Sequence, residues 1–120
     1  MKGILVNPEK GAEVLEFEDQ LEWYYNHLDC NTIDIATRQV QGKYFDFVCD
    51  DEGLWAELPV PSACNSAGKS MLVGKIFICN HDGFGNQSSL TDEECSMIMD
   101  HMATAMFNGG LIHVLADVDY

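Results

Sequence analysis

Met71-Leu-Val-Gly-Lys-Ile-Phe-Ile-Cys79 opens the stretch of sequence, residues 71–107, around which the rest of the chain is organised. This run is the most continuously apolar part of the sequence and is broken only by Gly74 and Lys75, so it predicts a buried strand. The next seven residues, Asn80-His-Asp-Gly-Phe-Gly-Asn86, predict a loop, because Gly and Asn favour turns and left-handed backbone. The stretch therefore begins as a strand followed by a glycine-rich loop.

A helix is predicted from Thr91 to Phe107. Glu94 stands three residues after Thr91, where its side chain completes a capping box. The apolar residues that follow recur at helical spacing and form one stripe: Cys95, Ile98, Met99, Met102, Ala103 and Met106. Asn108-Gly109-Gly110 then ends the helix as a C-cap. We expect the side that carries Ile98, Met99, Met102 and Met106 to pack on the sheet that contains the 71–79 strand.

The remaining segments predict a second helix and several more strands. Residues 19–28 form the helix, and strands are expected at 2–7, around 14–17, at 32–40, 44–49, 54–58 and 111–118. In the 44–49 strand Asp46 is expected to face outward, and Asp50-Asp-Glu-Gly53 makes a hairpin turn into the 54–58 strand. The fold class is therefore α+β. We expect a single compact domain over 1–120, with one mixed or antiparallel sheet of about five or six strands and two helices, 19–28 and 91–107.

Composition limits the classes of partner. The chain has 120 residues, 47% of them hydrophobic, which suffices for one domain with its own core. Twenty acidic residues stand against six basic ones, for a formal charge of −14. This balance argues against direct binding to nucleic acid or an anionic membrane, because both bind through Lys and Arg. Five scattered cysteines without a C-x-x-C pair, and the lack of a signal peptide, predict reduced thiols and a cytoplasmic location.

No motif predicts catalysis, a metal or a cofactor. Gly68-Lys69-Ser70 looks like the end of a phosphate-binding loop, but that motif needs a glycine at position 63, which is alanine, and a helix afterwards, where a strand is predicted. The four histidines lie in four different segments, so no local zinc motif exists. Cys95 belongs to the apolar stripe, and neighbouring carboxylates oppose a reactive thiolate there. We therefore expect a protein that is not an enzyme.

The acidic residues are the stronger functional signal. Residues 1–60 hold thirteen acidic and four basic residues, and the acids gather in two clusters, one before and within the first predicted helix and one in the 50–53 turn. Aromatic residues interleave with the first cluster, and an acidic surface with aromatic anchors suits a basic groove on a partner protein. The candidate partner-binding residues are Glu16, Glu18, Asp19, Glu22, Trp23, Tyr24, Asp50, Asp51 and Glu52. A solvated helix face and a polar hairpin tip remain the alternative interpretation.

Four short segments together resemble a family of small proteins known only as a domain of unknown function, from phages, mobile elements and Gram-positive bacteria. They are Ile4-Leu-Val-Asn-Pro8, Asp50-Asp-Glu-Gly-Leu54, Val73-Gly-Lys-Ile-Phe77 and Ser89-Leu-Thr-Asp-Glu-Glu94, and they span about three-quarters of the chain. The resemblance implies a compact α+β domain of mobile-element origin in a bacterial host cytoplasm. It brings no catalytic residues, and the part after Gly110 falls outside it.

Two functional hypotheses follow. In the first, the chain is an inhibitor that presents carboxylates where a basic host protein, such as a nuclease or defence enzyme, expects the phosphates of DNA. In the second, it is a small-molecule or nucleotide-binding domain that sequesters its ligand. That alternative needs basic or main-chain donors at its site, and Lys69, Lys75, Arg38 and Lys43 are the candidates apart from Lys2 and Lys10. A homo-oligomer is compatible with either hypothesis.

Overall fold

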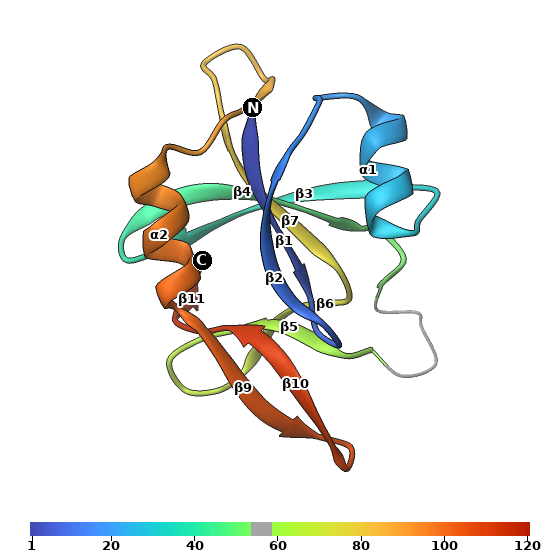
Figure 1. Cartoon of the computed structure of the whole chain (residues 1–120), viewed down its shortest axis with the longest axis vertical. Helices are drawn as coiled ribbons and strands as arrows, with labels where there is room; N and C mark the ends of the chain where they lie inside the picture. The colour runs from blue at the N-terminus through green and yellow to red at the C-terminus, as the bar shows by residue number, and fades with distance from the viewer. Residues whose placement is uncertain (54–58) are drawn as a thin grey trace.

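The computed structural model describes residues 1–53 and 59–120 and shows an α+β fold with two helices, as predicted. The strands form two sheets instead of one (Figure 1). The larger sheet has seven strands: β1 (Lys2–Asn7), β2 (Gly11–Glu16), β3 (Ile33–Val40), β4 (Lys43–Asp50), β7 (Ile76–His81), β8 (Gln87–Ser88) and β11 (Val118–Asp119). The smaller sheet has four: β5 (Pro61–Cys64), β6 (Ser70–Val73), β9 (Met102–Phe107) and β10 (Gly110–Leu115). The helices are α1 (Leu21–Leu28) and α2 (Asp92–Asp100).

The central strands of the larger sheet, β4, β7 and β1, carry most of its buried residues. Its order is β11-β3-β4-β7-β1-β2, and β8 extends it by pairing with the end of β7. Phe45 and Phe47 of β4 pack in the core that includes α2 and the smaller sheet, whereas Val48 packs in a second core under α1. Successive residues of a strand point to opposite faces, so one strand supplies both cores.

The 71–79 segment is not one strand, as predicted, but two strands in different sheets. Met71 and Leu72 belong to β6 of the smaller sheet, and Ile76 begins β7 of the larger one. The chain changes sheet at Gly74, whose φ of +73° is accessible to glycine at little cost. The Gly74 N–H donates to the Val60 carbonyl at 2.8 Å, which holds the link against the start of β5.

The predicted 91–107 helix is confirmed only in its first half. The capping box between Thr91 and Glu94 forms as predicted, but α2 ends at Asp100, and residues 102–107 are strand β9. β9 pairs with β10 through six residues, and Asn108-Gly109, with φ of 51° and 83°, makes the two-residue turn between them instead of a helix C-cap. The alternation in Met102-Ala-Thr-Ala-Met-Phe107 suits a strand as well as a helix, and pairing with β10 decides between them.

The predicted packing of the apolar stripe is correspondingly half right. Ile98 is buried in the larger core, and Met99 and Met102 pack against it from partly buried positions. Met106 is 71% exposed, because it lies on β9 and not on the helix. The expectation that Met106 covers the sheet is therefore wrong.

Most of the other predicted elements are confirmed. The strands expected at 2–7, around 14–17, at 32–40 and 44–49 are β1 to β4, and the 19–28 helix is α1. The expected 111–118 strand is divided between β10 and β11, which belong to different sheets. The expected 54–58 strand lies outside the described residues. Over the residues that the structure describes, none of the helices has the length and apolar character needed to cross a membrane.

Candidate interaction surface

The first acidic cluster surrounds the start of α1, whose inner face is fastened to the larger sheet. Tyr24 and Leu28 are buried against Val48 and Phe77 of that sheet. The helix ends at Asp29, whose left-handed backbone lets its N–H donate to the Tyr25 carbonyl. The outer face of α1 and the connection before it remain at the surface.

All four acids of the first cluster are exposed, and Asp19 is also held by hydrogen bonds. Glu18 and Glu22 have exposed side chains, and Glu16 pairs with the amino group of Met1 at 3.2 Å. Asp19 accepts a hydrogen bond from the Tyr24 hydroxyl at 2.8 Å and another from the Gln87 main-chain N–H at 3.0 Å. Asp19 therefore links the β8 region to α1, and each of its carboxylate oxygens already accepts one hydrogen bond.

Tyr24 does not belong to the surface. Its side chain is 2% exposed, and burial, together with the hydrogen bond to Asp19, raises the pKa of its hydroxyl well above the usual value. Trp23 is partly buried: its ring stacks on His27 with centroids 3.8 Å apart and meets Phe77 edge-on at 4.8 Å. Of the two predicted anchors, Trp23 alone has part of its side chain at the surface.

A shallow hollow of about 460 Å³ joins this indole to the exposed carboxylates. It is lined by Met1, Glu16, Phe17, Glu18 and Trp23. Two carboxylates and two aromatic side chains thus meet in one depression, beside the Met1 amino group that pairs with Glu16. An ammonium or guanidinium group would find both an ion-pair partner and an aromatic surface there.

The second cluster lies at the other end of α1. Asp50 is half-buried and accepts a hydrogen bond from the Glu52 N–H at 2.9 Å, whereas Asp51 and Glu52 are exposed. Asp50 lines the same pocket as Leu28 and Asp29, at the C-terminal end of the helix. Eight helical residues span ~12 Å, more than the ~8 Å screening length at physiological ionic strength. The clusters therefore act as two patches: the first acidic patch (Glu16, Glu18, Glu22) and the second acidic patch (Asp50, Asp51, Glu52).

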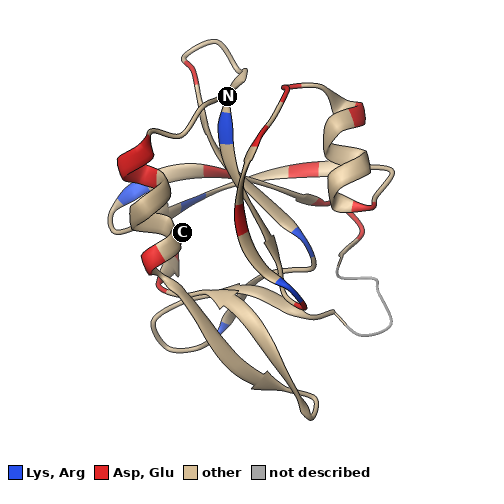
Figure 2. Cartoon of the chain, in the orientation of Figure 1, with Lys and Arg blue, Asp and Glu red and all other residues tan. Residues whose placement is uncertain are grey.

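The Lys and Arg side chains form their ion pairs outside both patches, although Arg38 lines a pocket together with Asp50 and Asp51, and the Met1 amino group pairs with Glu16. Lys2 pairs with Asp92, Lys43 with Glu94 and Lys75 with Asp29. All six Lys and Arg residues lie in the described ranges, and none of them forms an ion pair with a described acid of either patch. Figure 2 shows the same separation, with acidic residues and no basic ones on α1 and the segment that leads into it.

A buried polar network was not predicted from the sequence. Asp46, expected to face outward, is 6% exposed and accepts hydrogen bonds from Gln87 Nε2 at 2.7 Å and from Thr37 Oγ1 at 3.1 Å. His81 Nδ1 lies 3.2 Å from the same carboxylate. The alternation of the strand correctly places Asp46 on the face opposite Phe45 and Phe47. This face is also covered, because α1 and β8 lie over it. No pattern in the neighbouring sequence predicts that these two elements lie there.

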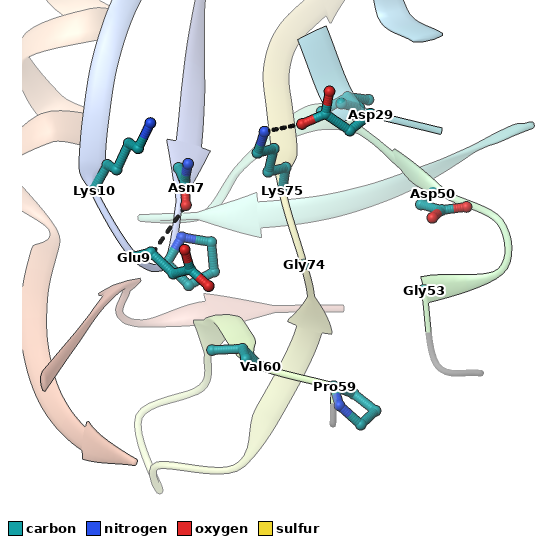
Figure 3. Close-up of a pocket in the computed structure, with 12 residues that line it drawn as sticks. Asn7, Glu9, Lys10, Asp29, Asp50, Gly53, Pro59, Val60, Gly74 and Lys75 are labelled. Atoms are coloured by element: carbon teal, nitrogen blue, oxygen red, sulfur yellow. Dashed lines mark hydrogen bonds and ion pairs between the residues drawn. The ribbon is translucent and has the colours of Figure 1, made fainter. Parts of the chain in front are cut away.

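The second functional hypothesis requires a pocket that attracts anions. A pocket of about 350 Å³ lies beside the β1–β2 turn and the end of α1 (Figure 3). Lys10 and Lys75 line it, but so do Glu9, Asp29 and Asp50, and Lys75 is already paired with Asp29. A phosphate group would therefore meet more negative than positive charge, so the pocket does not favour a nucleotide. Among the described residues no group of three His, Cys, Asp or Glu side chains could hold a metal ion.

Comparison with known proteins places the chain in a family. Residues 1–103 match the family model of DUF3846, a domain of unknown function, so the match runs from β1 to the first residues of β9. Comparison with curated proteins and with solved structures gave no match. The matched range holds both acidic patches and both helices and leaves out most of the β9–β10 hairpin. The chain belongs to the DUF3846 family.

Proposed function

We propose that this domain is a non-enzymatic binding protein that presents exposed carboxylates to a basic protein partner. The observation that carries the proposal is the hollow in which Glu16, Glu18 and Trp23 meet: among the described residues Glu16 pairs there with the Met1 amino group, and no Lys or Arg pairs with either acid. Clustered exposed carboxylates without a Lys or Arg partner produce a local negative potential that attracts a basic surface and speeds its encounter.

In this proposal the two patches have different roles. The first acidic patch receives a Lys or Arg side chain of the partner, which contacts Glu18 and the Glu16 oxygen that does not pair with Met1, while its stem covers the Trp23 ring. The second acidic patch, at the far end of α1, contributes Asp51 and Glu52 as a separate point of attraction. Tyr24 supports this surface from within, and Asp19, although exposed, has its carboxylate engaged by Tyr24 and Gln87.

The class of partner is a protein whose basic groove normally holds nucleic acid, such as a host nuclease or defence enzyme. Such a groove is lined by Lys and Arg that neutralise phosphates, and carboxylates compete for the same side chains. The domain would then act as a DNA mimic encoded by a phage or mobile element. This finer part of the proposal rests on the family resemblance of the sequence and on the chain's charge of −14.

The first test is to capture binding proteins from a bacterial lysate with the immobilised chain. The second is a competition assay that measures whether the chain displaces DNA from the captured protein. The variant Glu16→Gln, Glu18→Gln, Glu22→Gln removes three charges from the first acidic patch. The matched control, Glu9→Gln, Asp100→Asn, Asp119→Asn, removes three exposed charges elsewhere and has the same net charge. We expect the patch variant to lose the captured protein and the control to retain it.

The same capture separates specific from general charge effects. Equal retention by both triple variants would show that the first acidic patch is only a solvated surface. Capture that persists undiminished at high salt would show that carboxylates do not steer the encounter, since screening weakens exposed charge pairs. A captured protein that still binds its DNA in the presence of the chain would exclude the mimic mechanism.

A further inference from the structure

The outer edge of the smaller sheet is a regular strand with an open side. The sheet has the order β6-β5-β10-β9, so β9 is hydrogen-bonded to β10 on one side, and none of the described strands pairs with its other side. Four successive residues of β9, Ala103 to Met106, are exposed. Figure 1 shows the β9–β10 hairpin extending away from the helices at one end of the molecule.

The hairpin lacks the features that normally protect such an edge. Between Asp100 and Asp117 the chain contains no Asp, Glu, Lys or Arg, although charged residues make up 22% of the whole. Nor does β9 contain a proline, and its register with β10 continues through six residue pairs without a bulge. Charges, prolines and bulges are the usual means of preventing one edge strand from pairing with another. Met106 and Leu111, paired across the hairpin, are 71% and 60% exposed.

We propose that β9 is the surface through which two copies of this chain pair, edge to edge and antiparallel, into a two-fold dimer. A second copy is the occupant that charge favours. Two chains that each carry a charge of −14 repel each other wherever the carboxylates of one chain approach those of the other. The β9–β10 hairpin carries no carboxylates, so two copies can approach each other there. A basic partner would find no carboxylate to bind here.

The hairpin geometry determines which groups make the contact. In a two-residue hairpin the residues that flank the turn, Phe107 and Gly110, are hydrogen-bonded to each other. Alternate residues of β9 then bond to β10, and the N–H and C=O groups of Thr104 and Met106 point to the open side. If a two-fold axis passes beside Ala105, the outward N–H and C=O groups of Thr104 in one copy lie opposite those of Met106 in the other. This reciprocal pairing is what a closed dimer requires.

Sedimentation velocity over a wide range of protein concentration tests the proposal. The wild type is expected to reach twice the 13.4 kDa of one chain. Thr104→Pro removes one outward N–H per chain and leaves the bonds between β9 and β10 intact, since proline is tolerated on an edge strand whose N–H faces away from the sheet. We expect this variant to raise the dimer dissociation constant about tenfold or more.

A pair of glutamate variants supplies the matched control. Met106→Glu places a charge at the proposed contact, and Ser70→Glu places the same charge on β6, the opposite edge of the same sheet. The first is expected to produce monomers and the second to leave the dimer unchanged, with circular dichroism showing that both are folded. A wild type that stays monomeric at all concentrations, or a dimer equally stable in Thr104→Pro, would overturn the proposal.

Discussion

At the residue scale, Glu94 connects three elements. Its Oε1 accepts hydrogen bonds from the Thr91 N–H and from Asn80 Nδ2 of β7, both at 2.8 Å, and its carboxylate pairs with Lys43 of β4. Burial by itself would raise the pKa of Glu94, but the Lys43 contact and the hydrogen bonds from Thr91 and Asn80 outweigh it and lower the pKa. The side chain that begins α2 thus also ties the helix to the larger sheet.

Protonation of Glu94 should lower the free energy of unfolding of the domain at acidic pH. A carboxyl whose pKa is lower in the folded protein stabilises it above the pKa of the unfolded chain, and this contribution is lost as the pH falls through the folded value. The ordinary value is 4.5, so the loss belongs below that pH. We expect Glu94→Gln to lower the free energy of unfolding by about 1 to 3 kcal/mol at neutral pH.

Urea denaturation at neutral pH and at about pH 3 measures this contribution. The difference between wild type and Glu94→Gln should shrink at the lower pH. Glu93→Gln, at the exposed neighbouring position, is the control and should change stability little at either pH. A deficit of the same size at both pH values would mean that the charge of Glu94 is not what stabilises the fold.

The cysteines give a second residue-scale prediction. Burial, with a smaller effect of nearby carboxylates, raises the pKa of Cys49 to about 11 and that of Cys79 to about 12. The thiolate is the nucleophile that attacks a thiol reagent, so both cysteines should react slowly near neutral pH in the folded protein. After denaturation without reductant, all five cysteines should react, because all five are free thiols. Rapid labelling of Cys79 in the native state would contradict its burial.

At the scale of elements, two glycines permit backbone arrangements that a side chain would hinder: the change of sheet at Gly74 and the close approach of β1 to β7 at Gly3. Gly74 takes a positive φ at the change from β6 to β7, and a Cβ there would meet no atom within 4 Å. Gly3 lies in β1, where a Cβ would overlap the Phe77 ring and lie 2.8 Å from the Ile78 carbonyl oxygen. The first glycine is required by backbone conformation and the second by space.

The two glycines should therefore respond differently to alanine. Gly74→Ala incurs backbone strain alone, about 1 to 2 kcal/mol. Gly3→Ala must displace a buried aromatic ring or the paired strand, and we expect it to cost about 3 kcal/mol or more. Chemical denaturation of both variants provides the comparison. If Gly3→Ala lowered the free energy of unfolding less than Gly74→Ala does, β1 and β7 would not approach each other as closely as described.

At the scale of the whole molecule, the charge of −14 affects the two proposed contacts in opposite ways. Salt should weaken capture of a basic partner by the acidic patches, because it screens the attraction. Salt should strengthen pairing of two copies through the uncharged β9 edge, because it screens their repulsion. Both salt effects can be measured over one series of salt concentrations, by partner capture for the acidic patches and by sedimentation velocity for the β9 edge. The first-patch variant and Thr104→Pro are measured in parallel. A dimer that dissociates as salt rises would indicate a contact made by charged groups.

The sequence by itself determined the elements whose signals are local. The Thr91–Glu94 capping box, the alternating strands β3 and β4, and a helix at 19–28, observed as Leu21–Leu28, were all predicted, because short-range spacing decides each. The exposed acids of the two patches were also predicted, since charge excludes a side chain from a core unless it is paired. These features require no knowledge of distant segments.

Only the tertiary structure decided how those elements share two sheets. Met102–Phe107 is a strand because β10 lies beside it, and Met71–His81 is divided because its two halves pair with different neighbours. Asp46 and Tyr24 are buried because α1 and β8 cover a face that alternation alone leaves open. The physical reason is common to all four: an apolar periodicity shows which side of an element must be covered, whereas the covering segment is chosen by contacts between residues far apart in the chain.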